Sequence, residues 1–306
     1  MGMAEAHHGD DAKRIAYFGL PLGALALMRA GITPVVMGIG HPNAPGMLRI
    51  RRAELGDTLL MARPDLHHPL VRRAIDARRP DAILSFFWPK KIPADLLGSM
   101  PLGAFGTHPS LLPRHRGPDP IFWTLLEGDE ETGVSLHGLE REYDTGEIVE
   151  VRKLLVDGSM NSTRLARALD RLALPMLIEA GQRLSRGEAL RGAAQDESRA
   201  TLAPFPTNWD FSIDWKEPAA RVLGRVRASA PYPGAIAQLE DHTIVILEAE
   251  LGDGPSGFEP AEAFIDAGER VNIRAADAFI RIVRAVDLDE RSIDPAALLR
   301  GRDQEG

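Results

Sequence analysis

A histidine and an aspartate on two separate polar turns are the clearest candidates for chemistry in this sequence. His108 opens the stretch HPSLLP (108–113), and Asp144 lies in the stretch YDTGE (143–147). An imidazole can accept or donate a proton near neutral pH, and a carboxylate can orient it or take the proton itself. The two residues therefore predict acid–base chemistry, provided that the fold brings the two turns together.

Several other chemistries fit the sequence poorly. Ser110 follows His108 closely, but there is no Gly-x-Ser-x-Gly turn, so we expect Ser110 to hydrogen-bond the loop backbone or to hold a ligand. The turn after the first apolar run (19–23) lacks the glycine spacing of a dinucleotide site. The chain has no cysteine, and its histidines lack the spacing of a metal motif. We therefore expect no thiol catalysis, no dinucleotide cofactor and no catalytic metal.

The composition is that of an ordinary globular protein. The 306 residues are 44% hydrophobic and 26% charged, and the net charge is −8. This charge argues against nucleic-acid binding over the whole surface but leaves room for one basic region. The sequence has no apolar run long enough to cross a bilayer, and its N-terminus lacks the apolar core of a signal peptide. We expect a cytoplasmic protein with a disordered N-terminus over 1–13.

Strand-like and helix-like runs alternate through the first part of the chain. The stretch 41–63 fits neither pattern clearly. Strands are predicted at 14–19, 32–37, 81–87 and 104–106, and helices at 21–30, 70–78 and 93–100. This alternation predicts an α/β fold, a mostly parallel sheet with helices on both faces. Ligands bind beyond the carboxyl ends of such strands, where both His108 and the segment 88–91 fall.

The second part of the chain has a different pattern. Predicted strands at 133–139 and 148–156 flank Asp144, and a long helix covers 161–187. A proline-containing stretch then precedes one helix (217–228) and four short strands (235–239, 243–251, 270–273 and 278–286). We therefore predict a catalytic domain at 14–200, a linker at 201–210 and a small β-rich domain at 211–306.

Taken together, these motifs resemble those of the folate-dependent formyltransferases, which include the methionyl-tRNA and sugar-amine N-formyltransferases. The resemblance rests on 108–113, Arg116–Gly117, Pro120, Gly128, 132–134, Asp144–Gly146, 213–215 and 232–235, and it covers about 14–286. It implies a Rossmann-like catalytic domain followed by an open, OB-like barrel. It also implies transfer of a formyl group from 10-formyltetrahydrofolate to a primary amine without a metal.

The resemblance also implies the residues of the site. His108 and Asp144 match the family's catalytic histidine and aspartate, whereas the position of the family's catalytic asparagine falls on Gly106. The segments expected to hold the folate contribute Trp88, Lys90, Lys91, Ile92, Ser110, Leu111, Leu112, Pro113, Glu140 and Tyr143.

Gly106 is the main departure from the family pattern. An amide aimed at the developing oxyanion commonly contributes ~100–1000-fold in rate. Without this amide, three alternatives stay open: His108 acts alone, another donor such as a water in the space left by Gly106 substitutes, or the chain is a folate-binding homologue with impaired catalysis. Thr107 is adjacent but should point to the other face of an extended segment.

The sequence favours a tRNA acceptor without excluding a sugar. The two-domain layout supports initiator methionyl-tRNA, but the stretch 40–52, with Arg49, Arg51 and Arg52, is shorter and less lysine-rich than its counterpart in tRNA-formylating members. An amino-sugar nucleotide therefore remains the alternative acceptor.

Overall fold

The computed structural model describes residues 12–88 and 90–300. It divides into two compact units. Unit 1 contains the chain up to Arg116 together with 133–153 and 169–202, and unit 2 contains 117–132, 154–168 and the chain from Ala203 onward. We predicted disorder over 1–13, and residues 1–11 of that stretch lie outside the described part of the chain.

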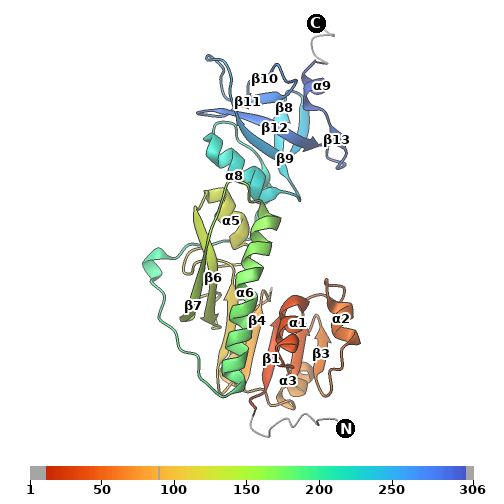
Figure 1. Cartoon of the computed structure of the whole chain (residues 1–306), viewed down its shortest axis with the longest axis vertical. Coiled ribbons are helices and arrows are strands. Elements are labelled where there is room, and N and C mark those ends of the chain that lie inside the picture. The colour runs from red at the N-terminus through yellow and green to blue at the C-terminus, as the bar shows by residue number, and fades with distance from the viewer. Residues whose placement is uncertain (1–11, 89, 301–306) are drawn as a thin grey trace, which may run out of the picture. The chain divides into compact units, whose positions relative to one another are not determined.

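A mostly parallel sheet organises unit 1 and confirms the predicted α/β class (Figure 1). Within the described residues it has seven strands, in the order β3-β2-β1-β4-β5-β6-β7. The first five run parallel, and β6 pairs antiparallel with β5. The strands are β1 (Ile15–Gly19), β2 (Val36–Ile39), β3 (Leu59–Ala62), β4 (Ala82–Phe86), β5 (Ala104–His108), β6 (Glu131–Gly138) and β7 (Ile148–Leu155).

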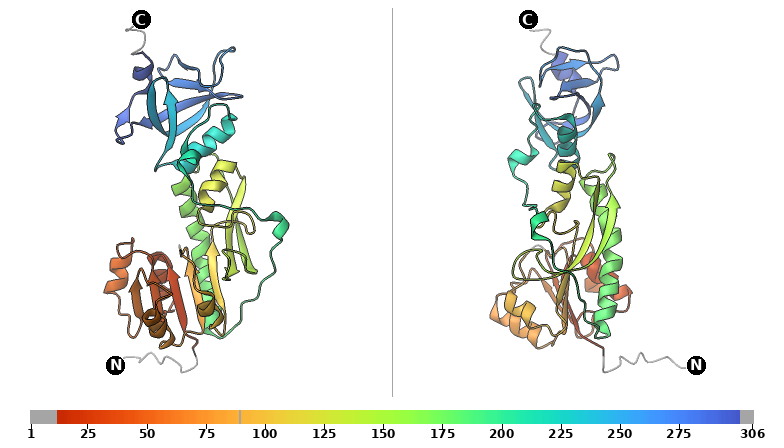
Figure 2. Two further views of the ribbon diagram at one scale, coloured as in Figure 1. Left: turned by 180° about the vertical axis from the view of Figure 1, so that it is seen from behind. Right: turned by 90° about the vertical axis from the view of Figure 1, so that its left-hand side faces the viewer.

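Helices cover both faces of this sheet (Figure 2). On one face lie α1 (Pro21–Arg29) and the C-terminal part of α6 (Ser162–Ser185). These two helices pack closely: a Cβ added to Gly181 of α6 would lie 2.9 Å from the side chain of Leu27 of α1. On the other face, Phe18 of β1 packs in one core with Ile75 of α3 (Pro69–Asp76) and Leu96 of α4 (Ala94–Gly98). The continuous apolar runs of β1 and β4 are buried from both sides, as expected for parallel strands.

The stretch 41–63, which has no clear pattern in the sequence, folds into α2 (Met47–Arg52) and the edge strand β3. In α2, Met47 and Ile50 are buried whereas the arginines are exposed. Such mixed patterns are hard to read from sequence because an edge strand and a one-sided helix bury only part of their residues. Strand β5 also extends two residues further than predicted, so that His108 is its last residue.

Unit 2 is built on a curled antiparallel sheet, which confirms the OB-like C-terminal fold. Its strands follow the order β10-β11-β12-β9-β8, and β13 pairs with β12. The strands are β8 (Ala235–Leu239), β9 (His242–Gly252), β10 (Ala263–Ile265), β11 (Val271–Arg274), β12 (Phe279–Val286) and β13 (Ser292–Ile293). Val222 and Val226 of α8 (Ala219–Ser229) pack into its apolar core.

Short helices complete the two units. Unit 1 also contains the 3₁₀ turn η1 (Glu197–Arg199), and unit 2 contains α5 (Pro120–Glu127), α7 (Asn208–Phe211) and α9 (Pro295–Arg300). Helix α7 begins inside the stretch predicted as a linker, where Thr207 and Asp210 form a capping box. No helix among the described residues is long and apolar enough to cross a membrane.

Candidate active site

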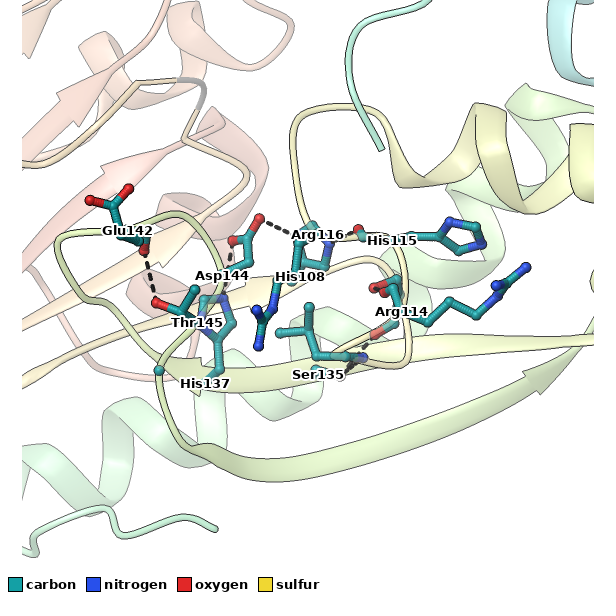
Figure 3. Close-up of polar contacts among 12 residues, drawn as sticks. His108, Arg114, His115, Arg116, Ser135, His137, Glu142, Asp144 and Thr145 are labelled. Atoms are coloured by element: carbon teal, nitrogen blue, oxygen red, sulfur yellow. Dashed lines mark hydrogen bonds and ion pairs between the residues drawn. The ribbon is translucent and has the colours of Figure 1, made fainter. Parts of the chain in front are cut away.

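The fold brings His108 and Asp144 together in unit 1 (Figure 3). His108 ends β5, and Asp144 lies in the turn between β6 and β7. The Nδ1 atom of His108 is 3.6 Å from Oδ2 of Asp144, and the two side chains are 7% and 15% exposed. A polar pair at the carboxyl end of a parallel strand lies where α/β sheets bind their ligands.

The orientation of His108 follows from its second ring nitrogen. Nε2 lies 2.8 Å from the carbonyl oxygen of His115. A carbonyl only accepts hydrogen bonds, so Nε2 carries the proton and donates it. In the neutral imidazole, Nδ1 is therefore the unprotonated nitrogen, and this atom faces Asp144.

A second histidine, which sequence reasoning missed, lies on the other side of the same carboxylate. His137 of β6 is the cross-strand partner of Gly106, and its Nε2 atom is 3.6 Å from Oδ1 of Asp144. Its Nδ1 atom donates to the carbonyl of Gly138 at 2.8 Å, which again leaves the nitrogen that faces Asp144 unprotonated. The available signal was the alternation of β6, which places His137 and Ser135 on one face of the strand.

Burial keeps His137 neutral. The side chain is 2% exposed, and desolvation lowers the pKa of His137 to about 4, against the opposing attraction of the Asp144 carboxylate. Asp144 therefore lies between two imidazoles that present lone pairs when both are neutral. Both nitrogen–oxygen distances, 3.6 Å, are longer than a hydrogen bond. A proton that enters the cluster would make the contact between Asp144 and one of the two imidazoles attractive.

The space beside Gly106 is filled by a side chain, contrary to the expectation of room for a water. A Cβ added to Gly106 would lie only 2.9 Å from Cδ2 of Leu139. Thr107 lies on the opposite face of β5, as expected from strand alternation, and its hydroxyl is buried.

The segment after His108 is held by hydrogen bonds of its own. Ser110 is fully buried and donates through Oγ to the carbonyl of Arg114 at 2.6 Å. The hydroxyl of Ser135 donates to the carbonyl of Ser110 at 2.8 Å and accepts from the amide of Leu112 at 3.1 Å. Leu112 is buried, and Leu111 and Pro113 are half-buried. Of the two roles expected for Ser110, the structure shows the one in which it organises the loop.

Two of the three segments expected to hold the folate, 88–92 and 140–143, lie next to each other. Lys91 pairs with Glu142 at 3.2 Å, and its Nζ atom is 4.9 Å from the centre of the Tyr143 ring. Trp88 packs against Phe18 and is half-buried. Among the remaining residues expected here, Ile92 is buried in the core, whereas Lys90 and Glu140 are exposed.

Arg116 is a buried charge held by several hydrogen bonds. It is 6% exposed, and its guanidinium donates to both carboxylate oxygens of Glu197, at 2.8 and 2.7 Å. It also donates twice to the side-chain oxygen of Gln195. The hydrogen bonds to Glu197 raise the pKa of Arg116, and the negative charge of Asp144 acts in the same direction.

Comparison with known proteins identifies the class to which this fold and site belong. Two family models match, "Formyl transferase" over 42–180 and "Formyl transferase, C-terminal domain" over 207–303. Methionyl-tRNA formyltransferases from Anaeromyxobacter dehalogenans (strain 2CP-1) and Anaeromyxobacter sp. (strain K) are 35% and 33% identical, over 92% of this chain and 95% of theirs. The chain therefore belongs to the formyltransferase family and is a folate-dependent formyltransferase.

Solved structures share the fold at low sequence identity. An N-formyltransferase from Helicobacter canadensis, in complex with folinic acid and dTDP-3-aminofucose, matches with a TM-score of 0.67 at 12% identity, over 90% of this chain and all of that one. HypX from Aquifex aeolicus, in complex with tetrahydrofolic acid, matches with a TM-score of 0.62 at 21% identity. That match covers 96% of this chain but only 48% of HypX.

Proposed function

We propose that this chain transfers the formyl group of 10-formyltetrahydrofolate to the amine of initiator methionyl-tRNA. The observation that carries the proposal is the Asp144 carboxylate, placed between His108 and His137 at the carboxyl edge of the sheet. The relatives named methionyl-tRNA formyltransferase support the acceptor, because they match over nearly their whole length. This activity would serve one-carbon metabolism and protein biosynthesis in the cytoplasm.

The proposed chemistry uses Asp144 and His108 as one proton-handling unit. The neutral amine attacks the formyl carbon, a new C–N bond forms, and the carbonyl electron pair moves to the formyl oxygen. Asp144 accepts the proton of the attacking amine and passes it to the unprotonated Nδ1 of His108, 3.6 Å away. The resulting imidazolium stabilises the oxyanion and then protonates the folate nitrogen as its bond to the formyl carbon breaks.

Within this scheme His137 stays neutral. Because its pKa is lowered to about 4, it does not compete for the proton near neutral pH. Its unprotonated Nε2 faces Oδ1 of Asp144 and can accept a hydrogen bond from that oxygen while Asp144 carries the proton, but it does not take the proton away from the path to His108. His137 thus partly takes over the organisation of a site that lacks an amide at Gly106.

The residues near the site fit a folate. Lys90 and Lys91 are exposed cations that suit a glutamate tail, and the indole Nε1 of Trp88 is buried with no partner among the described residues. We propose that the segments 88–92 and 140–143 hold the folate, together with 110–113. When bound, the folate supplies the formyl group, and the protein residues position it and move the proton.

Helix α2 carries a cluster of exposed arginines. Arg49, Arg51 and Arg52 of α2 are exposed, and α2 follows the carboxyl end of β2. Positive side chains on this edge of the sheet suit the phosphates of an RNA acceptor. Because the whole chain carries a net charge of −8, this cluster of arginines differs in sign from the rest of the molecule.

The acceptor is tested by turnover. Purified protein is incubated with 10-formyltetrahydrofolate and either charged initiator tRNA or an amino-sugar nucleotide, and formylated product is measured by mass spectrometry. We expect formylmethionine from the tRNA and none from a His108→Ala control. Turnover of the sugar alone would move the chain to the sugar-formylating group. Folate binding without turnover of either acceptor would support an impaired homologue.

The role of α2 is tested by charge reversal. Arg51→Glu with Arg52→Glu should raise KM for tRNA about tenfold and reduce the dependence of kcat/KM on salt, because two phosphate contacts are lost. The matched control reverses two exposed arginines on other helices, Arg29→Glu with Arg73→Glu. Equal effects in both variants would show a nonspecific effect of net charge and contradict a tRNA contact at α2.

We further propose that the stretch 201–210 separates the catalytic domain, 14–200, from the C-terminal domain, 211–306. The two family matches support this division because they end at 180 and resume at 207. Limited proteolysis should cut the folded protein first within 201–210. A first cut elsewhere among the described residues would contradict the boundary.

A further inference from the structure

The backbone of Asp144 adopts a conformation that needs support. Its φ is +56°, in the left-handed region that costs a residue with a side chain roughly 1 kcal/mol or more. Two residues later, a Cβ on Gly146 would collide with the carbonyl oxygen that ends β6. The turn is therefore pressed against the sheet, and interactions from outside it must hold Asp144 in place.

One side chain provides this support from a distant segment. Gln195, between α6 and η1, donates from Nε2 to the carbonyl of Asp144 at 2.8 Å and to the carbonyl of Gly146 at 2.7 Å. Its Oε1 accepts from Nε of Arg116 at 3.1 Å and from Nη2 at 2.7 Å. Both amide hydrogens and the amide oxygen are thus used, and exchanging N and O would place an acceptor against two carbonyls.

The other end of this connection reaches the loop of His108. Arg116 is held by Glu197 in a two-point ion pair, and its backbone amide donates to the carbonyl of Thr201 at 2.8 Å. The carbonyl of His115, which belongs to the peptide that joins it to Arg116, accepts the hydrogen bond from His108 Nε2. Gln195 is therefore bonded directly to the Asp144 turn and through Arg116 to the residues that orient His108.

We propose that Gln195 is a positioning residue for formyl transfer, which fixes the Asp144 carboxylate relative to the His108 imidazole by clamping the backbone on both sides of Thr145. The inference rests on the proposed roles of Asp144 and His108, but it does not depend on which amine is the acceptor. Gln195 does not touch the reacting atoms, so its effect must pass through Asp144.

The discriminating variant is Gln195→Glu. A carboxylate of the same shape keeps the contacts with Arg116 but loses both donors and turns an oxygen toward two carbonyls. We expect kcat to fall about 10- to 100-fold, because a displacement of about 1 Å in a catalytic group can cost 100-fold. KM for 10-formyltetrahydrofolate should change less than kcat, because Gln195 bonds Asp144 and Gly146 and not the folate segment 140–143. The matched control is Gln182→Glu on the exposed face of α6, which should leave both constants unchanged.

A double-mutant cycle separates positioning from general damage. In an Asp144→Asn background, Gln195→Glu should cost less than about twofold in single-turnover rate, because the carboxylate that it positions is already gone. The same loss in both backgrounds would overturn the proposal, as would a wild-type kcat for Gln195→Glu. If Gln195→Glu folds poorly, Gln195→Met keeps the packing and removes the donors, and the same criteria apply.

A measurement without turnover distinguishes failure of this inference from failure of the proposed function. Amide hydrogen exchange in a peptide spanning 140–148 should be at least tenfold faster in Gln195→Glu than in wild type, and unchanged in Gln182→Glu. Unchanged exchange would refute the clamp even if the enzyme formylates tRNA. Faster exchange in a protein that formylates none of the tested acceptors would uphold the clamp and refute the proposed acceptor.

Discussion

The neutral state of His137 has a measurable consequence for stability. Burial lowers the pKa of His137 to about 4 in the folded protein, from about 6.5 in an unfolded chain. Between these values the unfolded state binds the proton and the folded state does not, so the stabilisation is complete above about pH 6.5 and is lost as the pH falls toward 4. The full loss is about 3 kcal/mol, of which about 1 kcal/mol falls between pH 7.5 and 5.5.

The assay compares wild type with His137→Gln, which cannot titrate in this range. The free energy of opening of unit 1, from hydrogen exchange of β6 amides, should drop by about 1 kcal/mol more in wild type than in the variant between pH 7.5 and 5.5. The exposed His242, replaced by Gln, is the matched control and should behave as wild type. A direct NMR titration should find His137 unprotonated at pH 5.5. A midpoint near 6.5, or the same acid loss in His137→Gln, would refute the argument.

Other substitutions test the site directly. His108→Ala and Asp144→Asn should each lower kcat by about 100-fold or more, and wild-type rates in both would contradict their assignment. Gly106→Asn should fold, because only the flexible end of Leu139 obstructs a Cβ at this position. The double variant Gly106→Asn with Leu139→Ala should have a higher kcat than Leu139→Ala alone. A lower kcat would mean that Gly106 suits a different geometry of the site. Gly146→Ala should abolish activity while the second unit stays folded, because the new Cβ meets backbone; normal activity would show that the turn can move freely.

The sequence predicted the parts of the fold that have simple burial patterns. The apolar runs that form β1 and β4 are buried along their whole length, and their turn residues mark clear ends. The edge strand β3 and helix α2 were missed because each buries only some of its residues. Pattern reasoning works best where one environment covers an entire element.

The sequence also predicted that His108 and Asp144 belong to one site, but the residues that hold them escaped it. A lone histidine in an apolar strand is usually a core residue, so the alternation of β6 alone did not mark His137 as part of the site. Gln195 lies in a stretch without regular periodicity, and its partners are Arg116 and the turn at Asp144–Gly146, far away in sequence. Such contacts depend on tertiary structure alone, since no spacing rule links a side chain to carbonyls about fifty residues away.

The geometry changes the meaning of Gly106. A missing amide need not remove catalysis if the reaction depends mainly on moving a proton, because Asp144 still has an imidazole nitrogen 3.6 Å from each oxygen. Leu139 closes the space that the amide would have used, and the exclusion of water strengthens the electrostatic interactions within the cluster. In the proposed chemistry, the site therefore relies less on a fixed donor to the oxyanion and more on a precisely held carboxylate. This dependence makes the backbone of Asp144, and hence the hydrogen bonds from Gln195, more critical here than in a site that keeps its amide.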